Sequence, residues 1–94
     1  MYALAILRYR KPLEEVLRVV DDHRSYLQGL KDKGLLLVSG PLEPRYGGAL
    51  LLRVPDVAAL DVIRDADPFT KTGCAQYELL PWLPNTGLED LDRL

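Results

Sequence analysis

The chain contains a single histidine, His23, and its surroundings carry the strongest chemical signal in the sequence. Apolar residues recur at steps of three and four, and His23 fills the position between Val20 and Leu27 on that helical face. An imidazole facing a core needs a polar partner, because an unpaired buried polar group costs about 1–3 kcal/mol. Asp67, at the end of a second helical stretch, is a candidate partner. A buried His–Asp pair is typical of proton-transfer sites.

Both residues also have purely structural interpretations. A core histidine can be satisfied by a backbone carbonyl or a water molecule. An aspartate before a proline is a common turn residue, whose carboxylate accepts hydrogen bonds from nearby backbone N–H groups. The sequence alone leaves open whether His23 and Asp67 form a catalytic pair or two separate structural features.

Ser39 and Arg8 are the candidate substrate-binding residues. Ser39 precedes Gly40-Pro41 at the end of an apolar stretch, where its hydroxyl or the nearby amides could bond a ligand oxygen. Arg8 ends the first apolar stretch and could lean into a pocket, where arginine suits a carboxylate. The alternatives are that Gly40-Pro41 only ends a strand and that Arg8 reaches solvent.

The remaining candidates have weaker support. A serine hydrolase triad built on Ser39 is disfavoured, because no Gly-x-Ser-x-Gly sequence surrounds that serine. Tyr77 and Phe69 are predicted to be packing residues. Cys74 has no histidine or basic neighbour in sequence to activate it, so we expect a structural role.

Length and composition predict one domain over residues 1–94, with a polar tail from residue 81 that Trp82 and Leu83 could anchor to the body or to a neighbour. Hydrophobic residues make up 48 % of the chain, which is high for this length. We therefore expect a second subunit to cover apolar surface, in a homodimer or a higher homo-oligomer. The net charge of −2 argues against binding to nucleic acid or to an anionic membrane.

Several other classes are disfavoured. One cysteine rules out an intramolecular disulfide framework, and one histidine with one cysteine cannot complete a zinc site. No cluster of acidic residues suggests a magnesium site. The N-terminal residues lack the pattern of a signal peptide, and no apolar run is long enough to span a bilayer. We expect a cytoplasmic protein with no membrane association and no bound metal.

The elements that must position these residues alternate along the chain. Hydrophobic pattern, glycines and prolines predict strands at 2–9, 35–39, 49–54 and 75–80, helices at 12–33 and 56–66, and a loop at 40–48. The order βαββαβ predicts an α+β fold of the ferredoxin-like kind, an antiparallel sheet with both helices on one face. The other face is apolar, and pairing two such sheets would give a dimeric α+β barrel.

On these features the chain resembles the YciI-like family, also called the YCII-related domain. The resemblance rests on a tyrosine-bearing first strand followed in order by Asp22-His23-Arg24-x-x-Leu27, Gly34, Ser39-Gly40-Pro41, Gly48, Ala66-Asp67-Pro68-Phe69 and Pro81-Trp82.

The resemblance implies a dimeric ferredoxin-like α+β barrel with His23 and Asp67 in an active-site cleft. One relative is a dehydrochlorinase acting on a chlorinated hydroxyquinol, and the fold is similar to that of muconolactone isomerases. Both imply proton transfer on small cyclic or aromatic compounds without a metal or organic cofactor. The chain departs from the family in its acidic tail and in the loop at 42–46, where Glu43 and Arg45 replace more neutral residues.

Two functional hypotheses follow. The first is a cofactor-independent enzyme of the lyase or isomerase type, in which Asp67 orients His23 and His23 moves a proton. The second is a non-catalytic dimeric module that binds a metabolite or docks on another enzyme, since this fold supports many functions. A purely structural His–Asp pair is a third possibility.

Overall fold

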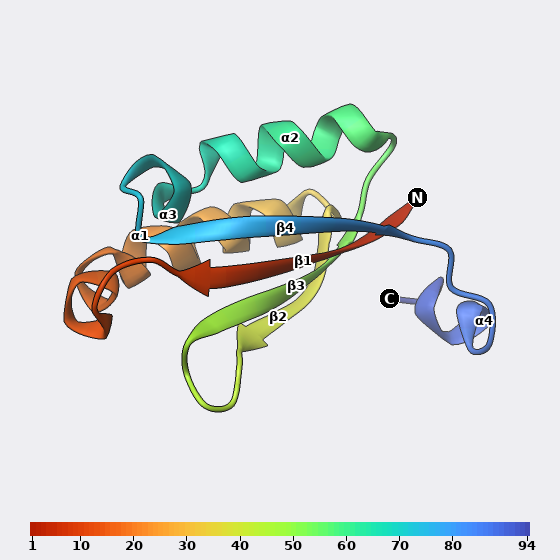
Figure 1. Ribbon diagram of the computed structural model, residues 1–94. Coiled ribbons are helices and arrows are strands. Elements are labelled where there is room, and N and C mark those ends of the chain that lie inside the picture. The colour runs from red at the N-terminus through yellow and green to blue at the C-terminus, as the bar shows by residue number, and fades with distance from the viewer.

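The computed structural model describes residues 1–94 and consists of one antiparallel sheet with its long helices on one side (Figure 1). The elements in chain order are β1 (Tyr2–Tyr9), α1 (Leu13–Asp32), β2 (Leu36–Pro41), β3 (Gly47–Arg53), α2 (Val57–Ala66), α3 (Pro68–Lys71), β4 (Ala75–Trp82) and α4 (Leu88–Leu91). The predicted ferredoxin-like α+β fold is therefore confirmed, with α3 and α4 as short additions.

The sheet has four strands in the order β2-β3-β1-β4. β1 is central and pairs antiparallel with both β3 and β4, which explains why this strand is apolar on both faces. Its residues Ala3, Ala5 and Leu7 are at most 1 % exposed and belong to the core cluster, together with Leu50 and Leu52 of β3. This core lies between the sheet and the helices.

The predicted loop at 40–48 is shorter in the structure and spans residues 42–46. Gly40 pairs with Ala49 and Pro41 with Gly48, so the residues that suggested a loop extend the β2–β3 ladder. β2 is an edge strand, where a proline is tolerated because no partner needs its missing N–H. Gly47 allows a close approach of β3 to β1, since a Cβ built on it would lie 1.9 Å from the Leu7 carbonyl oxygen.

The predicted break at Asp67-Pro68 marks the junction of two helices. Asp67 has extended backbone angles (φ −68°, ψ 129°), as the residue before a proline prefers. Pro68 then becomes the first residue of α3, a position that suits proline because its missing N–H would be unpaired there. The turn expected after the second helix therefore continues as the four-residue helix α3.

The C-terminal tail is held by residues of β1 and β3, beside the N-terminus (Figure 1). The Tyr2 hydroxyl donates to Asp92 at 2.5 Å, and the Arg53 guanidinium donates to the Leu94 carbonyl at 2.6 Å. Leu83 is 86 % exposed and does not anchor the tail to the body of this chain, so its predicted contact with a neighbour stays a prediction. Polar contacts anchor the tail instead.

The sheet face away from α1 and α2 carries no long helix. Leu4, Ile6 and Leu51 lie there, with the more exposed Val38 and Leu80. This is the apolar face that the alternation of the strands predicts.

None of the helices combines the length and the apolarity needed to cross a membrane. The cytoplasmic location expected from the sequence stays a prediction.

The close approach at Gly47 generates a prediction about stability. Gly47→Ala should lower the free energy of unfolding by at least about 2 kcal/mol, because the new Cβ would collide with the Leu7 backbone in the central strand. Gly29→Ala is the matched control. Gly29 lies inside α1 with no atom within 4 Å of a built Cβ, so alanine should raise stability by about 0.5–1 kcal/mol.

Urea unfolding of the three proteins measures both effects. Equal stability of Gly47→Ala and the wild type would contradict the close approach of β3 to β1.

Candidate functional site

His23 reaches the site because α1 presents one apolar stripe to the core. Val16, His23, Leu27 and Leu30 are its buried residues, at helical spacing. Pro12 precedes the first turn, and Glu14 and Glu15 in that turn suit the positive end of the helix dipole. His23 is 8 % exposed, so the helix carries the imidazole into the interior.

The structure brings His23 and Asp67 together. His23 Nδ1 lies 2.8 Å from Asp67 Oδ1, and the Asp67 side chain is fully buried. The same oxygen accepts the Phe69 backbone N–H at 2.9 Å, and Oδ2 accepts the Tyr77 hydroxyl. Three polar groups therefore converge on one buried carboxyl group, and both of its oxygens are engaged.

Tyr77 is a member of this cluster that the sequence interpretation assigned to packing. It lies opposite Leu7 in the β1–β4 register, on the helix-covered side of the sheet. Burial, followed by the Asp67 charge, raises the pKa of Tyr77 far above that of an ordinary tyrosine. The phenol is therefore held as a proton donor to Asp67. Burial and the same charge also raise the pKa of Tyr26, whose hydroxyl donates to the Ile63 carbonyl.

The orientation of the imidazole is fixed on two sides. The Phe69 ring stacks on it, with 3.9 Å between ring centroids and 9° between the planes. The contact of Nδ1 with Asp67 fixes the ring so that Nε2 is the nitrogen on the side away from the carboxylate. Nε2 has no protein partner and is not a fully buried atom, and His23 lines a cavity. Nε2 of His23 is therefore accessible from that cavity.

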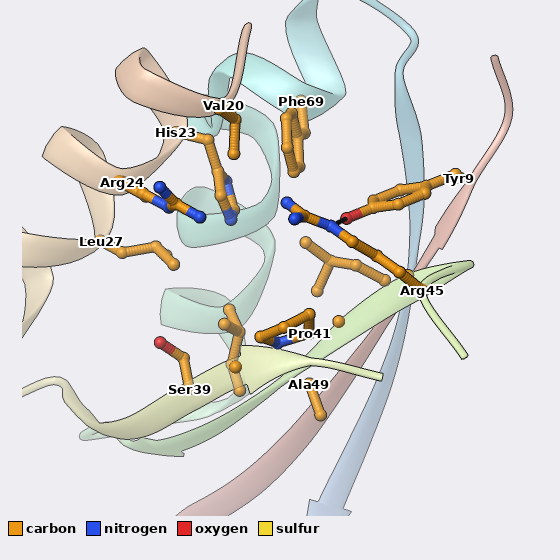
Figure 2. A pocket seen from close by; sticks show the side chains of 15 residues that line it. Tyr9, Val20, His23, Arg24, Leu27, Ser39, Pro41, Arg45, Ala49 and Phe69 are labelled. Atoms are coloured by element: carbon orange, nitrogen blue, oxygen red, sulfur yellow. Dashed lines mark hydrogen bonds between the residues drawn. The ribbon is translucent and has the colours of Figure 1, made fainter. Parts of the chain in front are cut away.

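The cavity has a volume of about 230 Å³ and lies between α1, α3, the strands β2 and β3, and the loop at 42–46 (Figure 2). An engineered cavity of about 150 Å³ is large enough to hold benzene, so this one accommodates a single substituted ring. Its walls are apolar at Val20, Pro41 and Phe69. Its polar side chains come mainly from His23, Tyr9, Arg24, Ser39 and Arg45.

Strand alternation separates the two predicted substrate-binding residues. Ser39 pairs with Leu50, which faces the core, and Ser39 lines the cavity. Arg8 does not line it. Arg8 shares the phase of Leu4 and Ile6, so it emerges on the sheet face without long helices and pairs with Glu78 at 2.7 Å. Arg8 instead lines a separate pocket beside Gln76 and Glu78, and its role in substrate binding stays a prediction.

Tyr77, Phe69, Arg24 and Arg45 complete the site, although the sequence interpretation did not assign them to it. Two signals were present. Arg24 follows His23 directly, and Arg45 stands in a loop position where a neutral residue was expected. No group of three or more histidine, cysteine, aspartate or glutamate side chains forms a candidate metal site.

Comparisons with known proteins agree with this architecture. The family model described as YCII-related domain matches residues 1–83, so the chain belongs to the YCII-related family, and the resemblance inferred from the sequence is confirmed. The fold is similar to that of 5-chloro-2-hydroxyhydroquinone dehydrochlorinase from Burkholderia phenoliruptrix, solved in complex with 2,5-dihydroxybenzoquinone. The TM-score is 0.80 at 22 % sequence identity, covering 92 % of this chain and 97 % of the other. No curated protein matches the chain.

The hydrogen bond from Tyr77 to Asp67 generates a prediction about stability at neutral pH and in alkali. Tyr77→Phe removes one donor from the buried carboxylate and should lower the free energy of unfolding by about 1–3 kcal/mol at pH 7. The folded-state pKa of Tyr77 is raised above the ordinary value of 10.0. The Tyr77 hydroxyl therefore contributes its full stabilisation below pH 10.0, and this stabilisation is lost progressively as the pH rises from there toward the folded-state pKa.

Urea unfolding from pH 7 to 11 should consequently show the gap between wild type and Tyr77→Phe narrowing in alkali. Tyr46→Phe is the matched control, because Tyr46 is 54 % exposed and its hydroxyl makes no hydrogen bond. A gap that stays constant across the pH range would contradict the role assigned to the Tyr77 hydroxyl.

Proposed function

We propose that this protein is a small-molecule enzyme of the lyase or isomerase type, in which His23 transfers protons and Asp67 orients it. The proposal rests on the buried 2.8 Å contact between His23 Nδ1 and Asp67 Oδ1 behind a ring-sized cavity. An oriented imidazole with one nitrogen facing a cavity suits general acid–base catalysis. The dehydrochlorinase activity of the protein with a similar fold supports the same reaction class.

In the proposed reaction, the Nε2 lone pair takes a proton from an O–H group, or from a C–H group next to a carbonyl. The electron pair left on the substrate either expels a leaving group, as in an elimination, or takes a proton back at another carbon, as in an isomerisation. The imidazolium returns its proton to the substrate or to water, which restores neutral His23. Asp67 stays ionised and stabilises the imidazolium while it exists.

Other parts of the site have supporting roles in this proposal. Ser39 is a candidate to hold a substrate oxygen, and Phe69 keeps the imidazole in plane. Tyr77 is a positioning residue, since it touches Asp67 and acts on His23 only through it. General acid–base catalysis typically contributes about 10²–10⁴-fold, so positioning in the cavity must supply the rest of the rate enhancement.

The rate of chloride release from 5-chloro-2-hydroxyhydroquinone measures the proposed activity, since the dehydrochlorinase with a similar fold is named for this compound. Wild-type protein should release chloride faster than buffer alone. His23→Gln and Asp67→Asn should each lose about 10²–10⁴-fold of the rate, because the first removes the base and the second removes the charge that supports its protonated form.

Asp65→Asn is the matched control for Asp67→Asn, since Asp65 lies two residues away, is exposed and pairs only with Arg64. It should keep the wild-type rate. Full activity of His23→Gln or Asp67→Asn would overturn the mechanism. Wild-type protein that binds ring compounds without forming any product would favour the alternative, a non-catalytic binding module.

We also propose that a second copy of this chain covers the apolar sheet face, giving a homodimeric α+β barrel. The face carries Leu4, Ile6 and Leu51 with the exposed Val38 and Leu80. Two copies related by a twofold axis present the same patch to each other, so an apolar face is self-complementary. The high hydrophobic content of 48 % supports burial beyond what one chain provides.

Light scattering coupled to size-exclusion chromatography checks this part of the proposal. Wild-type protein should show twice the chain mass of 10.6 kDa. Leu80→Glu should shift it toward the single-chain mass, because a buried unpaired charge is costly. Val62→Glu, at a 67 % exposed position of α2 on the other side of the sheet, should leave the mass unchanged. A monomeric wild-type protein would contradict the proposed dimer.

A further inference from the structure

The charge of the cavity is one-sided. Two of its lining residues, Arg24 and Arg45, are cationic at all working pH values, and no aspartate or glutamate lines it. The Asp67 carboxylate lies behind His23, fully buried and already bonded by three donors. A cleft lined by one sign of charge concentrates ligands of the opposite sign.

Neither cavity arginine has a carboxylate partner in the chain. Arg8, Arg64 and Arg93 each form an ion pair with a nearby acid. Arg24 forms no side-chain hydrogen bond or ion pair, and Arg45 makes only one contact, from Nε to the Tyr9 hydroxyl at 3.4 Å. An unpaired arginine on an open surface is hydrated. Arg24 and Arg45 are exposed as well, but they line the same small cavity, so an anion bound there can pair with both.

Arg45 is held in this arrangement by its loop. The backbone N–H of Leu42 donates to Gly47 at 2.9 Å, and the N–H of Tyr9 donates to Tyr46 at 2.9 Å, which ties both ends of the 42–46 loop to the sheet. The contact of Nε with Tyr9 leaves the terminal guanidinium nitrogens of Arg45 free. Figure 2 shows the side chains of Arg24 and Arg45 entering the cavity from opposite sides, with His23 between them.

We propose that Arg24 and Arg45 make this cavity selective for a ring-sized organic anion, whose charged oxygens they bind as specificity-determining residues. The guanidinium fork matches a carboxylate, or an ionised enol oxygen beside a carbonyl, with two parallel hydrogen bonds. The apolar walls at Val20, Pro41 and Phe69 suit the ring, and the volume of about 230 Å³ limits the ligand to one ring.

This inference names the ligand class of the cavity used by the proposed function and rests on that function only for the location of the site. It assigns binding to the two arginines and leaves proton transfer to His23. The two ideas can therefore fail separately.

The test is a calorimetric titration with two rings of similar size. 2,5-Dihydroxybenzoquinone, which is anionic at neutral pH, is compared with hydroquinone, which is neutral. Wild-type protein should bind the anion at least about tenfold more tightly, and added NaCl should weaken this binding. Arg24→Gln and Arg45→Gln should each weaken anion binding about tenfold and leave hydroquinone binding unchanged.

Arg18→Gln is the matched control, because Arg18 lies on the exposed side of α1 and does not line the cavity. It should bind both rings as the wild type does. Equal affinity of the wild type for the two rings, no binding of either, or wild-type affinity in both cavity variants would overturn the inference. Anion binding that depends on both arginines, with no turnover of any substrate, would retain the inference and overturn the enzyme proposal. A kcat/KM for an anionic ring that is unaffected in both arginine variants would do the reverse.

Discussion

The structure depends on one buried carboxylate. Asp67 takes a negative charge out of water, which is costly unless donors compensate it, and it receives one donor each from α1, α3 and β4. Losing any of these donors would leave a charge poorly compensated in the interior, so the interaction ties the first helix to the last strand across the core. The same donors orient His23. Fold and site therefore share one hydrogen-bonded centre, and the imidazole is fixed before any ligand arrives.

The sheet decides which other side chains join this centre. Successive strand residues point to opposite faces, so a shift of one position moves a side chain from the cavity to the other face of the sheet. Ser39 and Tyr77 share the phase of the core residues and reach the interior, whereas Arg8 does not. Gly47 then lets β3 approach Leu7 closely, which brings the short loop with Arg45 beside the cavity. A residue with a side chain at position 47 would hold that loop farther away.

The sequence was informative where local patterns control the outcome. The order of elements follows from hydrophobic period and from prolines, and the pairing of His23 with Asp67 follows from the need of a buried imidazole for a partner. Strand register and side-chain rotamers are set by contacts between residues far apart in the sequence, so local patterns do not predict them. Tyr77 reaches Asp67 because it lies opposite Leu7 in the pairing of β1 with β4. Arg45 reaches the cavity because a backbone hydrogen bond to Tyr9 holds its loop against the sheet. Gly40 and Pro41 are typical loop residues, and the sequence therefore predicts a loop. They belong to a strand here because β3 pairs with them, which the local sequence does not show.

The charged groups around His23 lie on opposite sides of its ring. Asp67 lies behind the ring at 2.8 Å from Nδ1, and Arg24 and Arg45 line the cavity in front of it. In the proposed complex, an anionic ligand between the two arginines would face the side of His23 opposite to Asp67, so the imidazole would separate two negative charges. A neutral ring of the same shape would leave both guanidinium groups without a partner, which is the physical basis of the proposed selectivity.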